Sequence, residues 1–206
     1  MKVLLVGATG ATAKYALPKL LAAGHQVTAF VRNANALTVK HERLAVAQGD
    51  ARDPAALAEA VKGQEAVMTL FGPRSLKKDD LQETFMRNLV AAMEKHGVKK
   101  LVNLSAWGSS RTRQYINLFF LPIRYTILRA VFNDKERGEQ LLFASGLDWV
   151  NVSPGRLTDG PEKGNVTASE DGKGVRNSIS RADLSSFMIA QLGSDTWVKK
   201  SPIIGA

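Results

Sequence analysis

The sequence VLLVGATGATAKYALPKLLAAGHQVTAFVRN, residues 3–33, determines the fold that we expect for the chain. Its apolar start, residues 3–6, predicts a buried strand, and residues 11–23 have the apolar spacing of a helix that ends at Gly24. A second apolar segment, residues 26–31, predicts another strand. A strand, a glycine-containing turn, a helix and a strand in this order are typical of a β-α-β unit in a parallel sheet.

The turn after the first strand has the spacing of a dinucleotide-binding fingerprint, with Gly7, Gly10 and Ala13 in the pattern G-x-x-G-x-x-A. Gly7 would allow the tight turn, and Gly10 would let the backbone approach a pyrophosphate closely. The pyrophosphate would lie at the positive end of the helix. The further groups that would bind it are amides and hydroxyls of Thr9, Ala11 and Thr12. The alternative is an ordinary strand-to-helix turn without a ligand.

Arg32 distinguishes between the two nicotinamide cofactors. It ends the second strand, 22 residues after Gly10, where an NAD-binding protein has an acidic residue for the ribose 2′-hydroxyl. A guanidinium at this position suits a 2′-phosphate, so we predict NADP(H) rather than NAD(H) as the cofactor. The alternative is an arginine that contacts only solvent.

The remaining sequence continues the alternation of strands and helices. Further strands are expected at residues 44–48, 66–71, 100–104, 147–152 and 197–204. Helices are expected at residues 54–62, from Asp79 or Asp80 to 96, at 122–145 and at 182–192, with loops at 106–120 and 158–176. No repeat or internal boundary is found. We therefore predict an α/β protein: one doubly wound, Rossmann-like domain over residues 1–206, with a mainly parallel sheet and helices on both faces.

The composition is typical of a soluble globular protein, with 45% apolar and 23% charged residues among 206. Cysteine is absent and the three histidines are scattered, so we predict no disulfide and no metal site. No apolar stretch reaches the roughly 18 residues of a membrane span, and no signal-peptide pattern is present, so we expect a cytoplasmic protein without membrane contact. The net charge of +9 comes from dispersed lysines and arginines, which favours a small polyanion over nucleic acid as the partner. We expect a monomer or a homodimer.

Short motifs follow one another along nearly the whole chain. They are Gly7-Ala8-Thr9-Gly10, Val31-Arg32, Gly49-Asp50-Ala51, Phe71-Gly72-Pro73-Arg74, Ser105-Ala106, Ser145-Gly146-Leu147-Asp148-Trp149, Ser153-Pro154-Gly155 and Ser180-Arg181-Ala182-Asp183-Leu184. In this order they resemble the atypical short-chain dehydrogenase/reductases. The particular similarity is to the NAD(P)H-binding branch that contains biliverdin-IXβ reductase (flavin reductase) and NmrA-like proteins.

The resemblance implies which residues contact the first half of the cofactor. Asp50 and Ala51 would contact the adenine. Phe71, Gly72 and Arg74 would line the path of the ribose and the pyrophosphate. These residues follow predicted strands, and open parallel sheets bind ligands at the carboxyl ends of their strands. Asp50 could instead only cap the segment that follows it.

The resemblance also implies the residues at the reacting end. Ser105 would lie beside the nicotinamide and Pro154 beside its carboxamide, although Ser105 could instead only complete a strand end. The usual Tyr-x-x-x-Lys pair is incomplete, because Lys135 is at the lysine position but Val131 is at the tyrosine position. This disfavours carbonyl reduction, whereas a flavin or a quinone can take its proton from solvent. Gly155 stands where some biliverdin-reductase-like members have a histidine. Lys135 could also be an ordinary lysine on a helix surface.

Residues 106–120 are expected to overhang the nicotinamide. Their aromatic and cationic side chains suit a planar anionic ligand: Trp107, Arg111, Arg113, Tyr115, Phe119 and Phe120. Phe119 and Phe120 could instead belong to the core or to a dimer contact. Ser105, Lys135 and Arg111 are the candidate catalytic residues.

The sequence thus predicts an NADPH-dependent oxidoreductase that transfers hydride to a flavin, a quinone or a similar planar conjugated acceptor. The alternative is a non-catalytic NADP(H)-binding redox sensor of the NmrA-like type.

Overall fold

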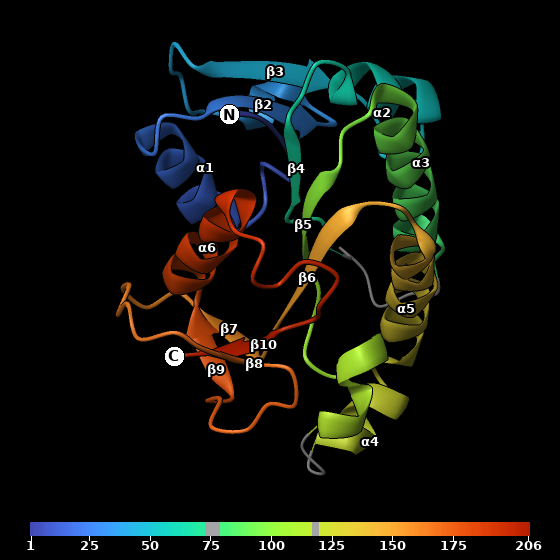
Figure 1. Ribbon diagram of the computed structural model, residues 1–206, viewed down its shortest axis with the longest axis vertical. Coiled ribbons are helices and arrows are strands. Elements are labelled where there is room, and N and C mark those ends of the chain that lie inside the picture. The colour runs from blue at the N-terminus through green and yellow to red at the C-terminus, as the bar shows by residue number, and fades with distance from the viewer. Residues whose placement is uncertain (73–78, 117–119) are drawn as a thin grey trace.

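The computed structural model describes residues 1–72, 79–116 and 120–206. Within these residues, the strands of the main sheet are β1 (Lys2–Val6), β2 (Gln26–Val31), β3 (Leu44–Gln48), β4 (Ala66–Thr69), β5 (Lys100–Leu104), β6 (Asp148–Pro154), β8 (Thr167–Ser169) and β10 (Ile203–Gly205). They form an eight-stranded sheet in the order β3-β2-β1-β4-β5-β6-β10-β8 (Figure 1). All neighbours are parallel except β10 and β8. The first six strands have the order of the doubly wound dinucleotide-binding fold, so the predicted fold class is confirmed.

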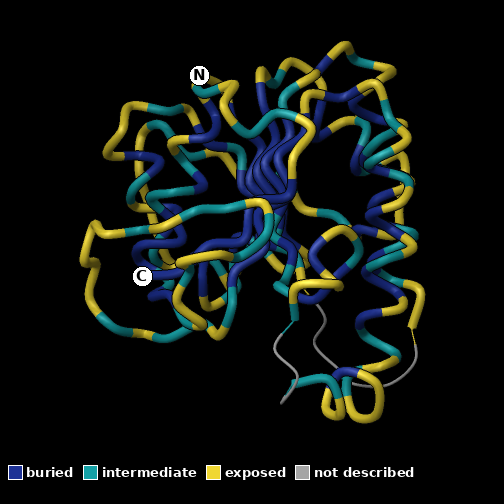
Figure 2. The backbone as a smooth tube through the Cα atoms, turned by 60° about the horizontal axis from the view of Figure 1, so that its bottom comes forward, coloured by how far each residue is buried: buried dark blue, intermediate teal, exposed yellow. Residues whose placement is uncertain are grey.

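Helices cover both faces of this sheet (Figure 1). One face carries α1 (Ala13–Ala22) and α6 (Arg181–Ala190), and the other carries α2 (Pro54–Val61), α3 (Leu81–His96) and α5 (Arg129–Ala144). Side chains alternate along each strand, so Val3 and Leu5 join the first core while Leu4 and Val6 join the second. The central strands are therefore buried on both faces, as parallel sheets require (Figure 2).

The prediction of a single helix over residues 122–145 is wrong, because the segment forms two helices. A short helix, α4 (Leu121–Tyr125), ends at Thr126, and α5 begins at Arg129. Thr126 has φ −108° and ψ −84°, outside the helical region. Its N–H and its hydroxyl both donate to the Pro122 carbonyl, at 3.0 Å and 2.7 Å, and complete the last turn of α4.

The two predicted loops contain short elements, and the predicted last strand is shorter than expected. The first loop includes a 3-10 helix, η2 (Ser110–Tyr115), and the second includes β8, which pairs with β10. Two more strands, β7 (Arg156–Thr158) and β9 (Ser178–Ser180), form a separate parallel pair. The strand predicted over residues 197–204 is limited to β10, since Lys199 has φ +58° and cannot be part of an extended strand.

The start of α3 is capped from another helix. Asp80 is at the N-cap position, as one of the two predicted residues, but its side chain accepts no bond from the helix amides. The carboxylate of Asp134, on α5, accepts the N–H of Gln82 at 2.9 Å and the N–H of Glu83 at 3.2 Å. A buried side chain from α5 therefore satisfies two amides that α3 itself leaves unpaired.

Replacing Asp134 by alanine should lower the free energy of unfolding by about 1–3 kcal/mol, because two helix amides lose their acceptor. Urea denaturation measures the change. Asp80→Ala is the matched control: the side chain of Asp80 makes only an exposed ion pair, so its loss should lower the free energy of unfolding much less than the loss of Asp134 does. Equal costs for the two variants would contradict the assignment of Asp134 as the cap.

Candidate functional site

A cavity of about 480 Å³ opens at the carboxyl ends of β1 to β4. It lies where the neighbouring strands β1 and β4 lead the chain in opposite directions, which is where doubly wound sheets bind ligands. Of the predicted cofactor residues, the cavity brings together Gly7, Thr9, Gly10, Arg32, Asp50, Ala51, Phe71 and Gly72. Four others do not line it, namely Ala11, Thr12, Ser105 and Pro154. Arg74 lies outside the described residues.

The two glycines of the turn lie close to backbone atoms, so a side chain at either position would be crowded. Gly7 has φ +84°, and a Cβ there would be 2.9 Å from the carbonyl carbon and oxygen of Leu70. Gly10 donates its N–H to the Gly7 carbonyl at 3.0 Å, and a Cβ on Gly10 would lie 3.2 Å from that oxygen. Because α1 begins only at Ala13, Ala11 belongs to the turn. At Gly7 and Gly10 the cavity wall is therefore backbone, and Thr9 lines the cavity beside them.

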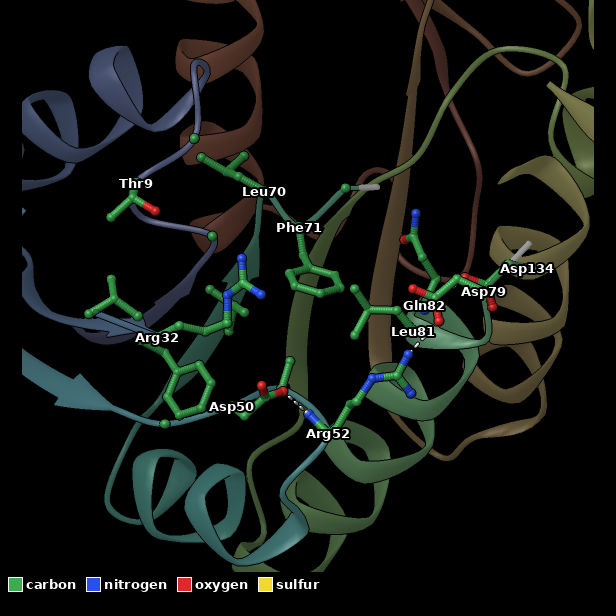
Figure 3. Close-up of a pocket in the computed structure, with 18 of the residues that line it drawn as sticks. Thr9, Arg32, Asp50, Arg52, Leu70, Phe71, Asp79, Leu81, Gln82 and Asp134 are labelled. Carbon is green, nitrogen blue, oxygen red and sulfur yellow. Dashed lines mark hydrogen bonds and ion pairs between the residues drawn. The ribbon is translucent and has the colours of Figure 1, made fainter. Parts of the chain in front are cut away.

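Two arginines line the cavity, and they differ in their partners. Arg52 donates to Asp80 at 2.6 Å and also to Asp79. Among the described residues no carboxylate pairs with Arg32, which is exposed. In Figure 3, Arg32 lies on the side of Thr9 and the glycine turn, whereas Arg52 points toward Asp79. Of these two arginines, Arg32 is therefore the one that can take up an anion.

Asp50 and Phe71 shape the cavity between these arginines. Oδ1 of Asp50 accepts the N–H of Arg52 at 2.8 Å, so Asp50 does cap the turn that follows β3, as the alternative interpretation held. Its Oδ2 is left to accept a further donor. The ring of Phe71 packs against that of Phe85 on α3, with ring centres 4.5 Å apart and planes tilted by 40°, and it lies between Arg32 and Leu81 (Figure 3). The cavity thus has a polar edge and an aromatic surface.

The reacting end predicted from the sequence lies at the next two strand ends. Ser105 directly follows β5, and its N–H donates to Val152 of β6 at 2.7 Å. Pro154 ends β6 and accepts the N–H of Trp107 at 2.8 Å. The Ser105 hydroxyl donates to Glu139 of α5, a buried residue that the sequence analysis missed. Its position four residues after Lys135, on the same helix face, is the signal that could have identified it.

Lys135 is buried, so it is not the surface lysine of the alternative interpretation. Its Nζ donates to the Leu104 carbonyl at 3.5 Å, at the end of β5. Burial lowers the pKa of Lys135, and the negative charges of Glu139 and Asp134 oppose this shift. Val131, one turn earlier at the tyrosine position, lines the cavity. None of the three tyrosines of the chain does so.

The structure does not bring Arg111 together with the other candidate catalytic residues. Its guanidinium lies 4.5 Å from the ring centre of Phe143 and 4.9 Å from that of Trp149. It also donates to the Lys199 carbonyl at 3.1 Å. Because Trp149 is near the amino end of β6, Arg111 points away from the strand ends that border the cavity.

The loop after β5 forms its own packing. Trp107 donates its ring N–H to the Tyr115 carbonyl at 2.9 Å, and the Phe120 ring meets Phe132 edge-on at 6.5 Å. Phe120 thus packs on α5, while Phe119 lies outside the described residues. At Gly155 a Cβ would be 2.6 Å from the Asn177 carbonyl oxygen, so this chain has no room for a histidine there.

The described part of the chain has neither a cluster of metal-binding side chains nor a membrane-spanning helix. No group of three His, Cys, Asp or Glu side chains could hold a metal ion there. None of the helices described is long and apolar enough to cross a bilayer.

Comparison with known proteins gives one family. The model of a family described as NAD(P)H-binding matches residues 7–195. An uncharacterised chloroplastic protein of Arabidopsis thaliana is 30% identical over 194 residues, which cover 87% of this chain and 68% of that protein.

Comparison with solved structures gives the fold. An anaerobilin reductase from Escherichia coli O157:H7 is 21% identical, with a TM-score of 0.85 over 100% of this chain and 97% of that one. A short-chain dehydrogenase/reductase from Veillonella parvula in complex with NADP is 18% identical, with a TM-score of 0.81 over 100% of this chain and 94% of that one. At these identities the structures show a shared fold alone.

Replacing Lys135 by methionine should change the pH dependence of stability. The pKa of Lys135 is lowered in the folded protein, whereas in the unfolded chain it has the ordinary lysine value of 10.5. At pH values between these two, the folded protein therefore binds fewer protons than the unfolded chain. Wild-type stability therefore gains from rising pH across this window, and the variant has no such gain. The free energy of unfolding of the wild type minus that of Lys135→Met should thus increase between about pH 7 and pH 10.

Urea denaturation at several pH values measures this difference. The exposed Lys14 of α1 provides the control, since Lys14→Met should differ from the wild type by an amount that does not change with pH. A flat difference for Lys135→Met would argue against a lowered pKa.

Proposed function

This chain belongs to the NAD(P)H-binding family, and we propose that it is an NADPH-dependent oxidoreductase acting on a flavin, a quinone or a similar planar conjugated acceptor. The observation that carries the proposal is Arg32, a cation in the cavity wall with no carboxylate partner among the described residues. We further propose that residues 1–206 act as one cofactor-binding domain.

The residues of the cavity fit a dinucleotide phosphate. The wall at Gly7 and Gly10 has no side chains, so a pyrophosphate could approach the backbone, with the Thr9 hydroxyl beside it. Arg32 would bind the 2′-phosphate, which would be its missing anionic partner. The Oδ2 of Asp50 would accept a hydrogen bond from the adenine amino group. The fold shared with the Veillonella protein, which holds NADP, agrees with this assignment.

The acceptor is inferred from the groups near the strand ends. Reduced nicotinamide, when bound, supplies a hydride. Val131 occupies the place of the usual acidic tyrosine, so the chain offers no phenol there to protonate a carbonyl oxygen. A conjugated ring spreads the arriving charge and can take its proton from water. Ser105 and Pro154 would border the nicotinamide at adjacent strand ends.

We expect the purified protein to oxidise NADPH in the absence of oxygen when FMN, riboflavin or a simple quinone is supplied. Anaerobilin belongs in the same panel, because a reductase of that compound shares the fold. The fall in NADPH absorbance with time, compared with a control without enzyme, measures the rates. Cofactor binding without turnover on any acceptor would overturn the reductase proposal. Capture of a protein partner only when cofactor is bound would then favour the redox sensor.

Replacing Arg32 by alanine should weaken NADP⁺ binding about 10- to 100-fold, since charge-assisted hydrogen bonds of about 1.5–3 kcal/mol are lost. NAD⁺ has no 2′-phosphate, so its affinity should change less than about threefold. Isothermal titration calorimetry measures both. Arg111→Ala, which removes an arginine outside the cavity, is the control and should bind NADP⁺ as the wild type does. A wild type that binds NAD⁺ and NADP⁺ equally would refute the role of Arg32.

A further inference from the structure

Glu139 is a buried carboxylate that the proposed reaction does not yet use. Only 2% of its surface is exposed. Both of its oxygens accept hydrogen bonds from serine hydroxyls. Oε1 accepts one from Ser105, and Oε2 accepts one from Ser109 at 2.8 Å. Burying a carboxylate is costly unless hydrogen bonds compensate for lost water, and these two serines supply that compensation.

The bond to Glu139 determines which way the Ser105 hydroxyl can act. A serine hydroxyl has one proton to donate and two lone pairs that accept. Because the Ser105 hydroxyl donates its only hydrogen bond to Glu139, its Oγ has only lone pairs left for any other group. Ser105 can therefore accept an N–H or O–H from a ligand, but it cannot donate to a ligand oxygen.

The surroundings of Glu139 are more polar than a core needs. One turn earlier on α5, Lys135 donates to Leu104, so the helix holds the end of β5 at two successive positions. On the sheet, Thr69 donates to Asn103 at 2.5 Å, and Asn103 donates to Asn151 at 2.6 Å, all three buried. Apolar side chains of similar volume would pack here at less cost, which favours a role other than stability for these groups.

We infer that Glu139 is a positioning residue, which holds Ser105 as a hydrogen-bond acceptor for the carboxamide –NH₂ of the bound nicotinamide. The inference rests on the proposed function, which places the nicotinamide beside Ser105. A primary amide carries two N–H donors, and the lone pairs of Ser105 are complementary to them. Pro154, which has no side-chain donor or acceptor, lies at the neighbouring strand end.

The test compares two ligands that differ only in the nicotinamide: NADP⁺ and 2′-phospho-ADP-ribose. Glu139→Leu frees the Ser105 hydroxyl to rotate, so NADP⁺ binding should weaken roughly five- to tenfold, the effect of one hydrogen bond. Binding of 2′-phospho-ADP-ribose should not change. Glu139→Gln should bind both ligands within about threefold of the wild type, because its amide oxygen can still accept the Ser105 proton.

Further variants separate positioning from a merely structural effect. Ser105→Ala should show the same selective loss of NADP⁺ binding, and adding Glu139→Leu to it should cause no additional loss. Ser109→Ala, which leaves the bond between Ser105 and Glu139 in place, is the matched control and should bind both ligands normally.

Each other outcome overturns a defined statement. An equal loss of both ligands in Glu139→Leu, or no loss of NADP⁺, would overturn the role of Glu139. If Glu139→Leu does not fold, Ser105→Ala decides, and unchanged NADP⁺ affinity in it overturns the inference. A wild type that binds neither ligand would instead refute the proposed function itself.

Discussion

The close approach of the first turn to the end of β4 sets the geometry of the site. Gly7 turns with φ +84°, and only the lack of a Cβ lets it lie against the Leu70 carbonyl. Since β1 pairs in parallel with both β2 and β4, the carboxyl ends of the three strands lie together, and with them the turn, Arg32 and Phe71. Any side chain at Gly7 would separate these strand ends, and with them the walls of the cavity.

Local charge pairing, rather than the number of cations, distinguishes the two arginines of this cavity. The carboxylates of Asp79 and Asp80 neutralise Arg52 and tie the turn after β3 to the start of α3. Those carboxylates would repel a phosphate if Arg52 did not cover their charge. Arg32 has no such partner among the described residues, so its field remains available. One arginine thus closes the cavity wall and the other can attract the ligand.

The sequence was sufficient for features that depend on neighbours along the chain. The strands, the glycine turn and the position of Arg32 follow from periodicity and spacing over fewer than about 35 residues. It was insufficient where distant segments meet: Asp134 caps α3 and Glu139 binds Ser105, and no local pattern connects those pairs. The helix break at Thr126 was missed because its apolar spacing continues through residues that leave the helical region. Arg111, predicted for its charge, stacks on aromatic rings instead.

The direction of the hydrogen bonds at the end of β5 bears on the proposed chemistry. Reduction of a carbonyl needs a proton donor in position as the hydride arrives, because charge then concentrates on one oxygen. Here the Ser105 hydroxyl donates its hydrogen bond to Glu139, and the nearby Lys135 donates one to the Leu104 carbonyl. Lys135 is buried, so its side chain is little exposed to solvent. A conjugated ring tolerates this arrangement, since its charge is delocalised and water can protonate it after the hydride has been transferred.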